Sequence, residues 1–491
     1  MSVDTFSAGV ESGVAQARRG MTRRQALAAA VATGVAVGAV RLLGTSLQKL
    51  AQPHPTSGTD WISPLGSESA RVMHLLRRTT FGYTAGQLEA ALSAGFGRTV
   101  DRLLDSPPSE PPNFAAAATP GGRFPIAQLQ QWWVDQMLNT PTPFAERMTL
   151  FWHGHFTSDY RKVGGEHTFM YWQNLTWRRM ALTNLRSMLM QVTTDPAMLR
   201  YLDLSSSTGK NPNENYSREL MELFTIGPGN YSEEDVRQGA RALAGWQLPK
   251  PDSFATVVVD KATQATRTLP VYASQAAGVF NKRRAYNGAV TFLGHSGSID
   301  TEGVVDRILA QPGTAPFIAA KVAQHFVNAQ PDPGYVNRLA DTFRRSKYDI
   351  KSLMHAVFTS DEFAAGESYR ALLKTPTEFM VHAAKALGAT GMSKVIVAAG
   401  PGMGQSLFDP PDVNGWPNNA AWISSNTVVQ RVNFVTAALA HVKSSLPSAT
   451  RAVHRHLEGI VSAQTANLFN QTTDERTRWF ITLASPEFQL K

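Results

Sequence analysis

"NPNENYSRELMELFTIGPGNYSEEDVRQGARALAGW", residues 211–246, predicts two consecutive helices separated by a glycine-containing turn. Asn211 followed by Pro212 is typical of a helix start, with asparagine as the N-cap and proline as the first helical residue. Glu214 is three residues after Asn211, close to the position whose side chain completes a capping box. Gly227 is expected to end this first helix. The first half of the stretch therefore predicts a helix that begins at Asn211 and ends at Gly227.

The second helix of the stretch is bounded with equal clarity. Ser232 is expected to be its N-cap, and Asp235 stands three residues later, where it can complete a capping box. Gly245 and Trp246 close the helix. Two capped helices within 36 residues favour a mainly helical protein.

The first helix is amphipathic, since at about 100° per residue its apolar side chains fall on one side. This apolar face holds Tyr216, Leu220, Leu223 and Phe224. A charged stripe lies nearly opposite and holds Glu214, Arg218 and Glu222. Spacings of four residues favour ion pairs on a solvated face. Arg237 and Arg241 of the next helix are natural counter-ions for these glutamates.

Glu219 does not fit a purely solvated face. It lies only about 80° from the centre of the apolar face and shares an edge with Asn215. A half-buried carboxylate needs a partner, because stranding an unpaired charge costs several kcal/mol. Two interpretations stay open: a structural ion-pair network, or a functional site. In the second, Glu214, Arg218, Glu219 and Glu222 are the candidate catalytic residues, and Asn213 and Asn215 the candidate substrate contacts.

Helical spacing of apolar residues also dominates the rest of the chain. The exception is 253–293, where β-branched runs separated by turn signals predict a small antiparallel hairpin. We therefore expect a mainly α, bundle-like globule with a β insertion. The expected divisions are an export signal at 1–45, a linker at 46–66, a helical half at 67–250, the β insertion at 251–297 and a second helical half at 298–491.

Composition excludes several classes of function. The 491 residues carry a net charge of +9, part of it in the first 50 residues, and the only dense basic run is Lys282–Arg284. Nucleic-acid binding is therefore not expected. The chain has no cysteine, which excludes disulfides and thiolate chemistry. A bound divalent metal would need histidine and carboxylate ligands.

The amino terminus resembles a twin-arginine export signal. Arg23 and Arg24 directly precede a weakly apolar run rich in Ala, Val and Gly from Ala26 to Val40. The run is short for a membrane span of about 20 residues. An alanine-rich amphipathic helix or a retained anchor is the alternative. We expect an exported protein, periplasmic or secreted, that uses the twin-arginine machinery.

Several further segments are similar to signatures of one bacterial family. They are "HLLRRTTFG" (74–82), "FWHGHFTS" (151–158), "MLRYLD" (198–203), "NENYSRELMELFTIG" (213–227), "YSEEDVRQGARALAGW" (231–246), "FLGHSG" (292–297), "LFDPPDVNGWP" (407–417) and "LASPEFQ" (483–489). Together they resemble the domain of unknown function 1800 family over about residues 60–491. The resemblance implies an exported bacterial protein and, as a partner, a protein of the sulfatase-like domain of unknown function 1501 family. It implies no reaction.

"FWHGHF" places His153 and His155 two residues apart. On a helix they would point about 200° from each other, so joint metal ligation requires an extended segment, which Gly154 permits. Neutral imidazole is a common ligand for zinc, copper or iron. Glu219 or Glu222 could complete such a site. The alternative is a pair of histidines hydrogen-bonded in a core.

"LFDPPDVNGWPNNAAW" (407–422) predicts a non-helical loop, because its prolines and Asn414-Gly415 forbid a continuous helix. Asp409, Asp412 and Asn414 can contact a substrate or cation, and Trp416 can stack on a sugar face. Such residues also make Asx turns that hold their own loop together.

These segments lead to one functional hypothesis and one rival. We expect 151–159, 213–222 and 409–416 to form a polar cleft of a metal-assisted hydrolase that acts on an envelope or extracellular substrate. The rival is a non-catalytic binding or assembly protein for surface polymers or for a sulfatase-like partner.

Overall fold

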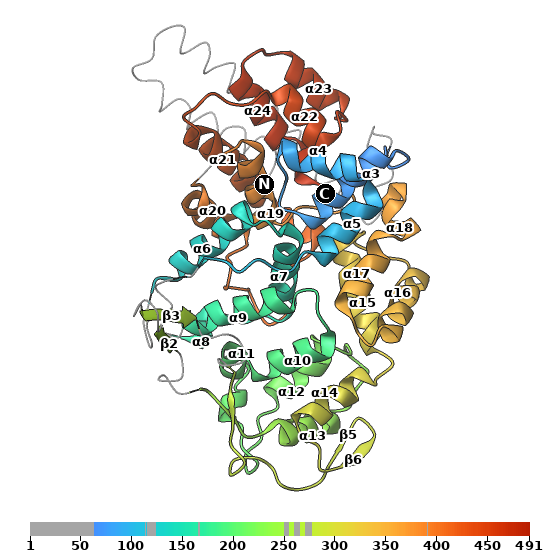
Figure 1. Ribbon diagram of the computed structural model, residues 1–491, viewed down its shortest axis with the longest axis vertical. Helices are drawn as coiled ribbons and strands as arrows, with labels where there is room; N and C mark the ends of the chain where they lie inside the picture. Colours follow the sequence, from blue (N-terminus) through green and yellow to red (C-terminus); the bar gives the residue numbers. More distant parts are fainter. Residues whose placement is uncertain are drawn as a thin grey trace. The chain divides into compact units, whose positions relative to one another are not determined.

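The computed structural model describes residues 63–112, 114, 124–164, 167–249, 255–259, 266–270, 277–389 and 391–491. These residues are mainly helical, with short antiparallel strand pairs, which confirms the predicted fold class (Figure 1). The predicted export signal and most of the predicted linker lie outside the described residues.

The chain folds into two units, each assembled from separate segments. In the described part of the chain, unit 1 comprises the residues up to 96, 364–405 and 417–491, and unit 2 comprises those in 97–363 and 406–416. This division differs from the sequential halves expected at 67–250 and 298–491. Periodicity marks single helices, whereas long-range packing decides which helices share a unit.

Unit 1 is helical. Its elements are α3 (Glu68–Thr79), α4 (Ala85–Ala94), η4 (Gly366–Ser368), α19 (Pro376–Ala386), α20 (Ser393–Ala399), η5 (Pro401–Met403), η6 (Asn419–Trp422), α21 (Ser425–His441), α22 (Ala449–Leu457), α23 (Ala463–Asn470), α24 (Glu475–Ala484) and α25 (Pro486–Gln489). Within it α24 packs against α21, α22 and α23.

Unit 2 contains the remaining helices and the strands. Its helices are α5 (Phe96–Asp105), α6 (Ile126–Asn139), α7 (Pro143–His155), α8 (Tyr160–Val163), α9 (His167–Met180), α10 (Leu185–Thr194), α11 (Pro196–Tyr201), η2 (Leu204–Ser206), α12 (Asn215–Glu222), α13 (Glu233–Leu243), α14 (Thr301–Leu309), α15 (Thr314–Phe326), α16 (Pro333–Arg345), α17 (Ile350–Phe358) and α18 (Asp361–Ala364). Helices α15, α16 and α17 pack side by side.

The predicted β insertion is present as separate pairs rather than one hairpin. Strand β2 (Ala255–Val259) pairs antiparallel with β3 (Thr266–Pro270), β1 (Trp246–Gln247) with β4 (Val279–Phe280), and β5 (Val290–Phe292) with β6 (His295–Gly297). The turn between β5 and β6 is attached to α13, since the backbone N–H of Leu293 donates to Asp235 Oδ1 at 2.8 Å.

The ends of α12 and α13 test the predicted caps. Helix α13 begins as predicted, with a reciprocal capping box between Ser232 and Asp235. The predicted start of α12 at Asn211 is wrong: Asn211 pairs with Thr208 in a turn, and the helix begins at Asn215. Asn213 is the side chain that accepts the N–H of Asn215, at 3.0 Å. An Asx side chain two residues before a helix can accept a backbone N–H of its first turn. The Asn211-Pro212 pair was therefore not the helix start, although its chemistry is suitable for one.

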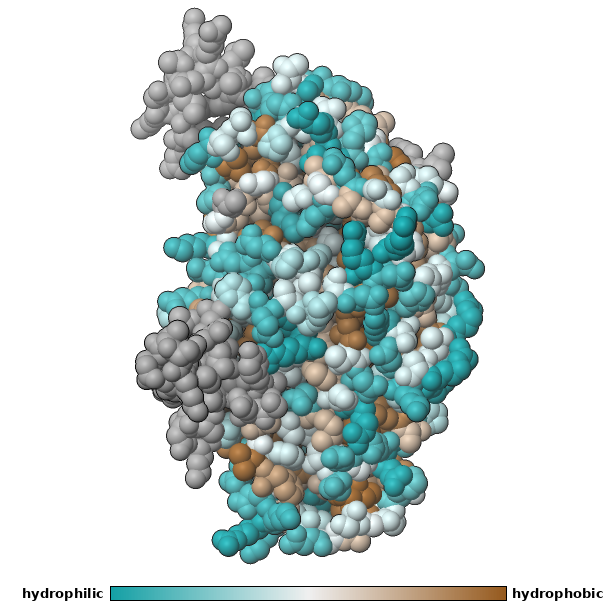
Figure 2. Space-filling model, viewed as in Figure 1, coloured by the Kyte–Doolittle hydropathy of each residue, from teal (hydrophilic) through white to brown (hydrophobic). Residues whose placement is uncertain are grey.

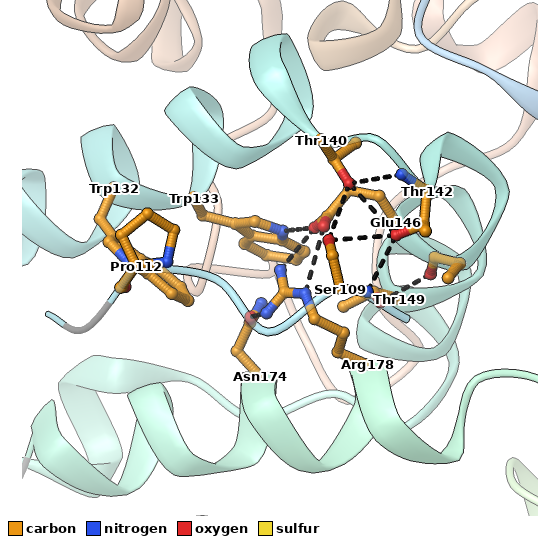
Figure 3. A network of polar contacts seen from close by, with 11 residues as sticks. Ser109, Pro112, Trp132, Trp133, Thr140, Thr142, Glu146, Thr149, Asn174 and Arg178 are labelled. Carbon is orange, nitrogen blue, oxygen red and sulfur yellow. Dashed lines mark hydrogen bonds and ion pairs between the residues drawn. The ribbon is translucent and has the colours of Figure 1, made fainter. Parts of the chain in front are cut away.

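A buried ion pair joins α6, α7 and α9 in the core of unit 2 (Figure 3). Arg178 Nη2 donates to Glu146 Oε1 at 2.6 Å, and both side chains are only 3% exposed. Trp133 Nε1 donates to the same oxygen at 2.6 Å, and Asn174 accepts from Arg178 at 2.7 Å. Each charge is thus compensated within the core, which is the condition for burying an ion pair without large cost. The network fixes three helices against one another.

The face drawn in Figure 2 shows small apolar groups among its described residues. On the face drawn in Figure 2, hydrophobic residues are scattered among hydrophilic ones. The large apolar side chains exposed in the described residues are Leu92, Val279 and Phe280. No helix in the described part of the chain combines the length and apolar character needed to cross a membrane.

Candidate functional site

His153 is buried beneath the loop 406–416 of unit 2. Its Nε2 accepts the backbone N–H of Phe408 at 3.1 Å, and its ring packs edge-on against Trp133. Burial lowers the pKa of His153 to about 3, so the imidazole is neutral. The Nε2 lone pair, which a metal would need, already accepts the backbone N–H of Phe408.

His155 has a different set of neighbours. Its Nε2 donates to the backbone carbonyl of Phe224 at 3.0 Å, and its ring lies near Phe317. Burial, and then the positive charge of Lys321, lower the pKa of His155 to about 3. The hydrogen bond to Phe224 connects α7 to the segment that follows α12.

The two histidines are therefore not brought together. Helix α7 runs through His155 instead of ending near 153, so the two imidazoles project in widely different directions. In the described residues, no group of three or more His, Asp or Glu side chains is arranged to hold a metal ion. The extended backbone that joint ligation by His153 and His155 requires is helical in the structure.

Loop 406–416 is a structured part of unit 2. Gln130 Nε2 donates to the Leu407 carbonyl at 2.8 Å, and Thr157 Oγ1 donates to that of Val413 at 2.6 Å. Phe408 has a φ of +64°, and two hydrogen bonds hold it there: its N–H donates to His153 Nε2, and its carbonyl accepts the Tyr160 N–H. The loop is non-helical, as predicted, and is anchored by α6, α7 and the start of α8.

Gly415 allows this loop to approach α7 closely. Its φ is +84°, and a Cβ atom there would lie 2.3 Å from the carbonyl oxygen of Gly154. Only glycine fits both conditions. The side chain of Trp416 follows, with its ring 5.2 Å from that of His153. The Trp416 indole N–H is buried and has no hydrogen-bond partner among the described residues.

The side chains predicted as loop ligands have different environments. Asp409 forms an ion pair with Arg161 at 2.6 Å, and burial raises the pKa of its carboxyl group despite that pairing. Asp412 is exposed, and its Oδ1 accepts the N–H of Asn414 at 2.7 Å. Asn414 is exposed as well. The predicted Asx turn is confirmed, and the second carboxylate oxygen of Asp412 stays available to solvent.

Tyr201, the last residue of α11, is the point at which the separate segments meet. Burial raises the pKa of Tyr201 to about 12, and the negative charges of Asp159, Asp412 and Glu219 add to the effect, against Arg161. Three carboxylates, at the N-cap of α8, in the loop 406–416 and on helix α12, therefore lie close enough to Tyr201 to affect its phenol electrostatically. The Tyr201 hydroxyl has no hydrogen-bond partner in the described part of the chain.

Glu219 is half-buried, as predicted. Burial, and then the negative charge of Glu222, raise the pKa of Glu219, and Arg218 opposes the shift. None of the described residues makes a hydrogen bond to its carboxylate. Next to it, Asn215 Nδ2 donates to Asp203 Oδ2 at 3.1 Å, and Lys162 binds the same aspartate at 2.9 Å.

The other three candidate catalytic residues on α12 form surface contacts. Arg218 binds both oxygens of Glu233, at 2.6 and 2.7 Å, and contacts Glu214 at 3.4 Å. Glu222 accepts the hydroxyl of Tyr231 at 2.5 Å. Their contacts are those of a solvated, ion-paired face, the structural interpretation of the stripe.

We define the Tyr201 cluster as Asp159, Arg161, Tyr201, Glu219, Asp409 and Asp412. It combines carboxylates that keep free acceptor positions with a neutral phenol that can donate. Such a surface can bind hydroxyl groups or ammonium groups, and Lys162, whose Nζ lies 5.7 Å from the Tyr201 ring centre, borders it.

A family model described as a protein of unknown function, DUF1800, matches residues 74–490. The chain belongs to the DUF1800 family. No curated protein and no solved structure matches it. Membership covers nearly all the described residues of this DUF1800 protein, including both units and the whole Tyr201 cluster.

Sequence reasoning missed three members of the cluster in this DUF1800 protein. Asp159, Arg161 and Tyr201 stand in segments quoted above or beside them, but each appears as an ordinary helix-end residue. Asp159 caps α8, where its Oδ1 accepts the Arg161 N–H at 2.8 Å. The sequence signal that could have identified these residues is the high density of polar residues at the ends of short helices.

Proposed function

We propose that this DUF1800 protein is an exported cell-envelope protein that binds a hydroxyl-rich polymer through the Tyr201 cluster. The observation that carries the proposal is the convergence of Asp159, Glu219 and Asp412, from three distant segments, around Tyr201.

Carbohydrate hydroxyl groups suit this surface. Neighbouring hydroxyls donate hydrogen bonds to carboxylate oxygens, and the Tyr201 phenol can donate in return. Glu219 and one oxygen of Asp412 are free to accept. Export, which the proposal includes, is supported by the arginine pair Arg23-Arg24 and the apolar run behind it. A sulfatase-like protein of the domain of unknown function 1501 family is the proposed partner.

Hydrolysis of the same polymer is the second candidate function. Glu219 favours it, because a carboxyl group with a raised pKa can act as a general acid. The metal-assisted form of this hydrolysis has less support than an acid–base form, since His153 Nε2 is already bonded to the loop.

The experiment is a titration of the full-length protein with polysaccharide isolated from the native host envelope. The variant Glu219→Gln/Asp412→Asn should weaken binding at least about tenfold, which corresponds to about 1.4 kcal/mol. The matched control is Glu362→Gln/Asp341→Asn, which removes the same two charges from ion pairs elsewhere in unit 2.

Equal affinities for the variant, the control and the wild type would overturn the proposal. Release of new reducing ends during the titration, lost in Glu219→Gln alone, would select hydrolysis over binding.

A further inference from the structure

Strand β4 of unit 2 carries two adjacent apolar side chains that are exposed. Val279 is 53% exposed and Phe280 is 41% exposed, and they are among the few large apolar residues exposed in the described part of the chain. Phe280 pairs with Trp246 across the two-stranded sheet of β1 and β4, and the centres of the two rings are 5.3 Å apart. Trp246 Nε1 donates to Thr301 Oγ1 at 2.9 Å, which fixes the indole beneath the exposed pair.

The backbone on both sides of this apolar pair is anchored. The N–H of Gly278 donates to the carbonyl of Thr194 at 2.7 Å, and the N–H of Asn281 donates to the carbonyl of Gly245 at 2.9 Å. Asn281 Oδ1 accepts the N–H of Arg283 at 3.0 Å, in an Asx turn that follows β4 directly. The fold therefore holds the two apolar side chains at the surface.

Exposed cations from two segments lie beside the apolar pair. Lys282 and Arg283 are part of the Asx turn, and both are exposed. The N–H of Gly209 donates to the carbonyl of Arg284 at 2.7 Å, which brings a second segment against the turn. Lys210 follows Gly209 directly and is also exposed. We define the β4 surface as Lys210, Val279, Phe280, Lys282 and Arg283.

The described residues do not neutralise the charge of the β4 surface. Neither Lys210, Lys282 nor Arg283 forms an ion pair with a described residue. The sequence has no Asp or Glu at 204–213 or at 277–299, the two segments that supply the surface. The β4 surface thus combines protruding apolar side chains with positive charge of one sign only.

This combination fits a lipid surface. Anionic headgroups attract lysine and arginine, and the boundary between headgroups and acyl chains accepts apolar side chains. A nucleic acid could neutralise the same cations, but it offers no apolar phase to an aliphatic side chain such as Val279.

We propose that unit 2 docks on the surface of an anionic phospholipid membrane through the β4 surface. Lys210, Lys282 and Arg283 contact lipid phosphate groups, and Val279 and Phe280 enter the boundary between headgroups and acyl chains. This docking does not depend on polymer binding by the Tyr201 cluster, so the two proposals can fail separately.

Co-sedimentation of the full-length protein with vesicles provides the test. Vesicles of phosphatidylcholine alone are compared with vesicles of equal parts phosphatidylcholine and phosphatidylglycerol, at low and at high sodium chloride. Each basic residue near an anionic surface strengthens binding about fivefold. Lys282→Gln/Arg283→Gln should therefore bind the anionic vesicles at least about tenfold more weakly than the wild type. High salt should also weaken binding of the wild type, because it screens the surface charge.

Matched control variants separate this surface from general effects. Arg345→Gln/Lys347→Gln removes the same charge from exposed positions at the end of α16, and it should bind like the wild type. Phe280→Ser should weaken binding severalfold, whereas Leu92→Ser, which replaces an exposed apolar residue of unit 1, should not. The apolar run at 26–40 is present in every variant, so its own affinity for lipid cancels in these comparisons.

Equal binding of the anionic vesicles by either test variant and its matched control would overturn the proposal. Binding of a single-stranded oligonucleotide that Lys282→Gln/Arg283→Gln abolishes, with no binding of vesicles, would overturn it as well and would assign the cations to nucleic-acid phosphates.

Discussion

Asp195 gives the strongest prediction about stability. It is 5% exposed, caps α11, and accepts the N–H of Met198 and the amide of Gln173, each at 2.8 Å. All donors that contact it are neutral amides. Replacing Asp195 with Asn keeps a side-chain oxygen for the cap, since asparagine caps helices as well as aspartate, and removes the titrating group.

The magnitude follows from the pKa of the carboxyl group. Burial raises the pKa of Asp195 from 3.8 to about 7, and the amide donors only partly oppose the shift. A shift of about 3 units corresponds to roughly 4 kcal/mol at 1.36 kcal/mol per unit. Because the folded-state pKa is raised, the contribution of Asp195 to stability is complete below pH 4. It is lost as the pH rises towards 7.

Urea unfolding at pH 4.5 and pH 8 measures this effect. We expect Asp195→Asn to exceed the wild type by only about 1 kcal/mol at pH 4.5 and by up to about 4 kcal/mol at pH 8. The control Asp474→Asn keeps an N-cap oxygen for α24 but removes a carboxyl group whose pKa is lowered, chiefly by the hydroxyl of Thr477, so it should lose stability at pH 8. An Asp195→Asn protein that is equally stable or less stable than the wild type at pH 8 would refute the reasoning.

Three further predictions concern the core and the loop of unit 2. Glu146→Ala leaves Arg178 buried without its counter-ion and should cost about 3–5 kcal/mol in urea unfolding, whereas Glu146→Leu/Arg178→Met should recover most of the loss; a single variant within 1 kcal/mol of the wild type would contradict this. His153→Ala removes the acceptor of the Phe408 N–H and should cost about 1–3 kcal/mol, visible as faster hydrogen exchange at Phe408; unchanged exchange would contradict the contact. Gly415→Ala places a Cβ against the α7 backbone and should lower the melting temperature, and an unchanged melting temperature would show that the loop can move away.

The helical class and the caps of α13 could be predicted because they depend on local chemistry. The capping contacts between Ser232 and Asp235 lie within one helix end, so their sequence spacing contains the needed information. The start of α12 could not, since Asn211 pairs with Thr208 in a turn that precedes the helix. The division into interleaved units could not be predicted either, because long-range packing produces no periodic pattern in a single sequence.

The segments that form the candidate site could be predicted, but its central residue, Tyr201, could not. The half-buried position of Glu219 follows from helical geometry, and the Asx turn at Asp412 follows from its own loop. Tyr201 could not be selected, because its importance comes from carboxylates supplied by distant segments. The spacing of His153 and His155 led to the prediction of an extended segment, because Gly154 permits one. The core around α7 imposes a helix instead.

A crystal structure of the protein soaked with an oligosaccharide from the host envelope polymer tests the central claim most directly. The account predicts sugar density beside Tyr201, with hydroxyl groups within hydrogen-bond distance of Glu219 and Asp412. Density at any other surface, with the Tyr201 cluster left in contact with water alone, would contradict it.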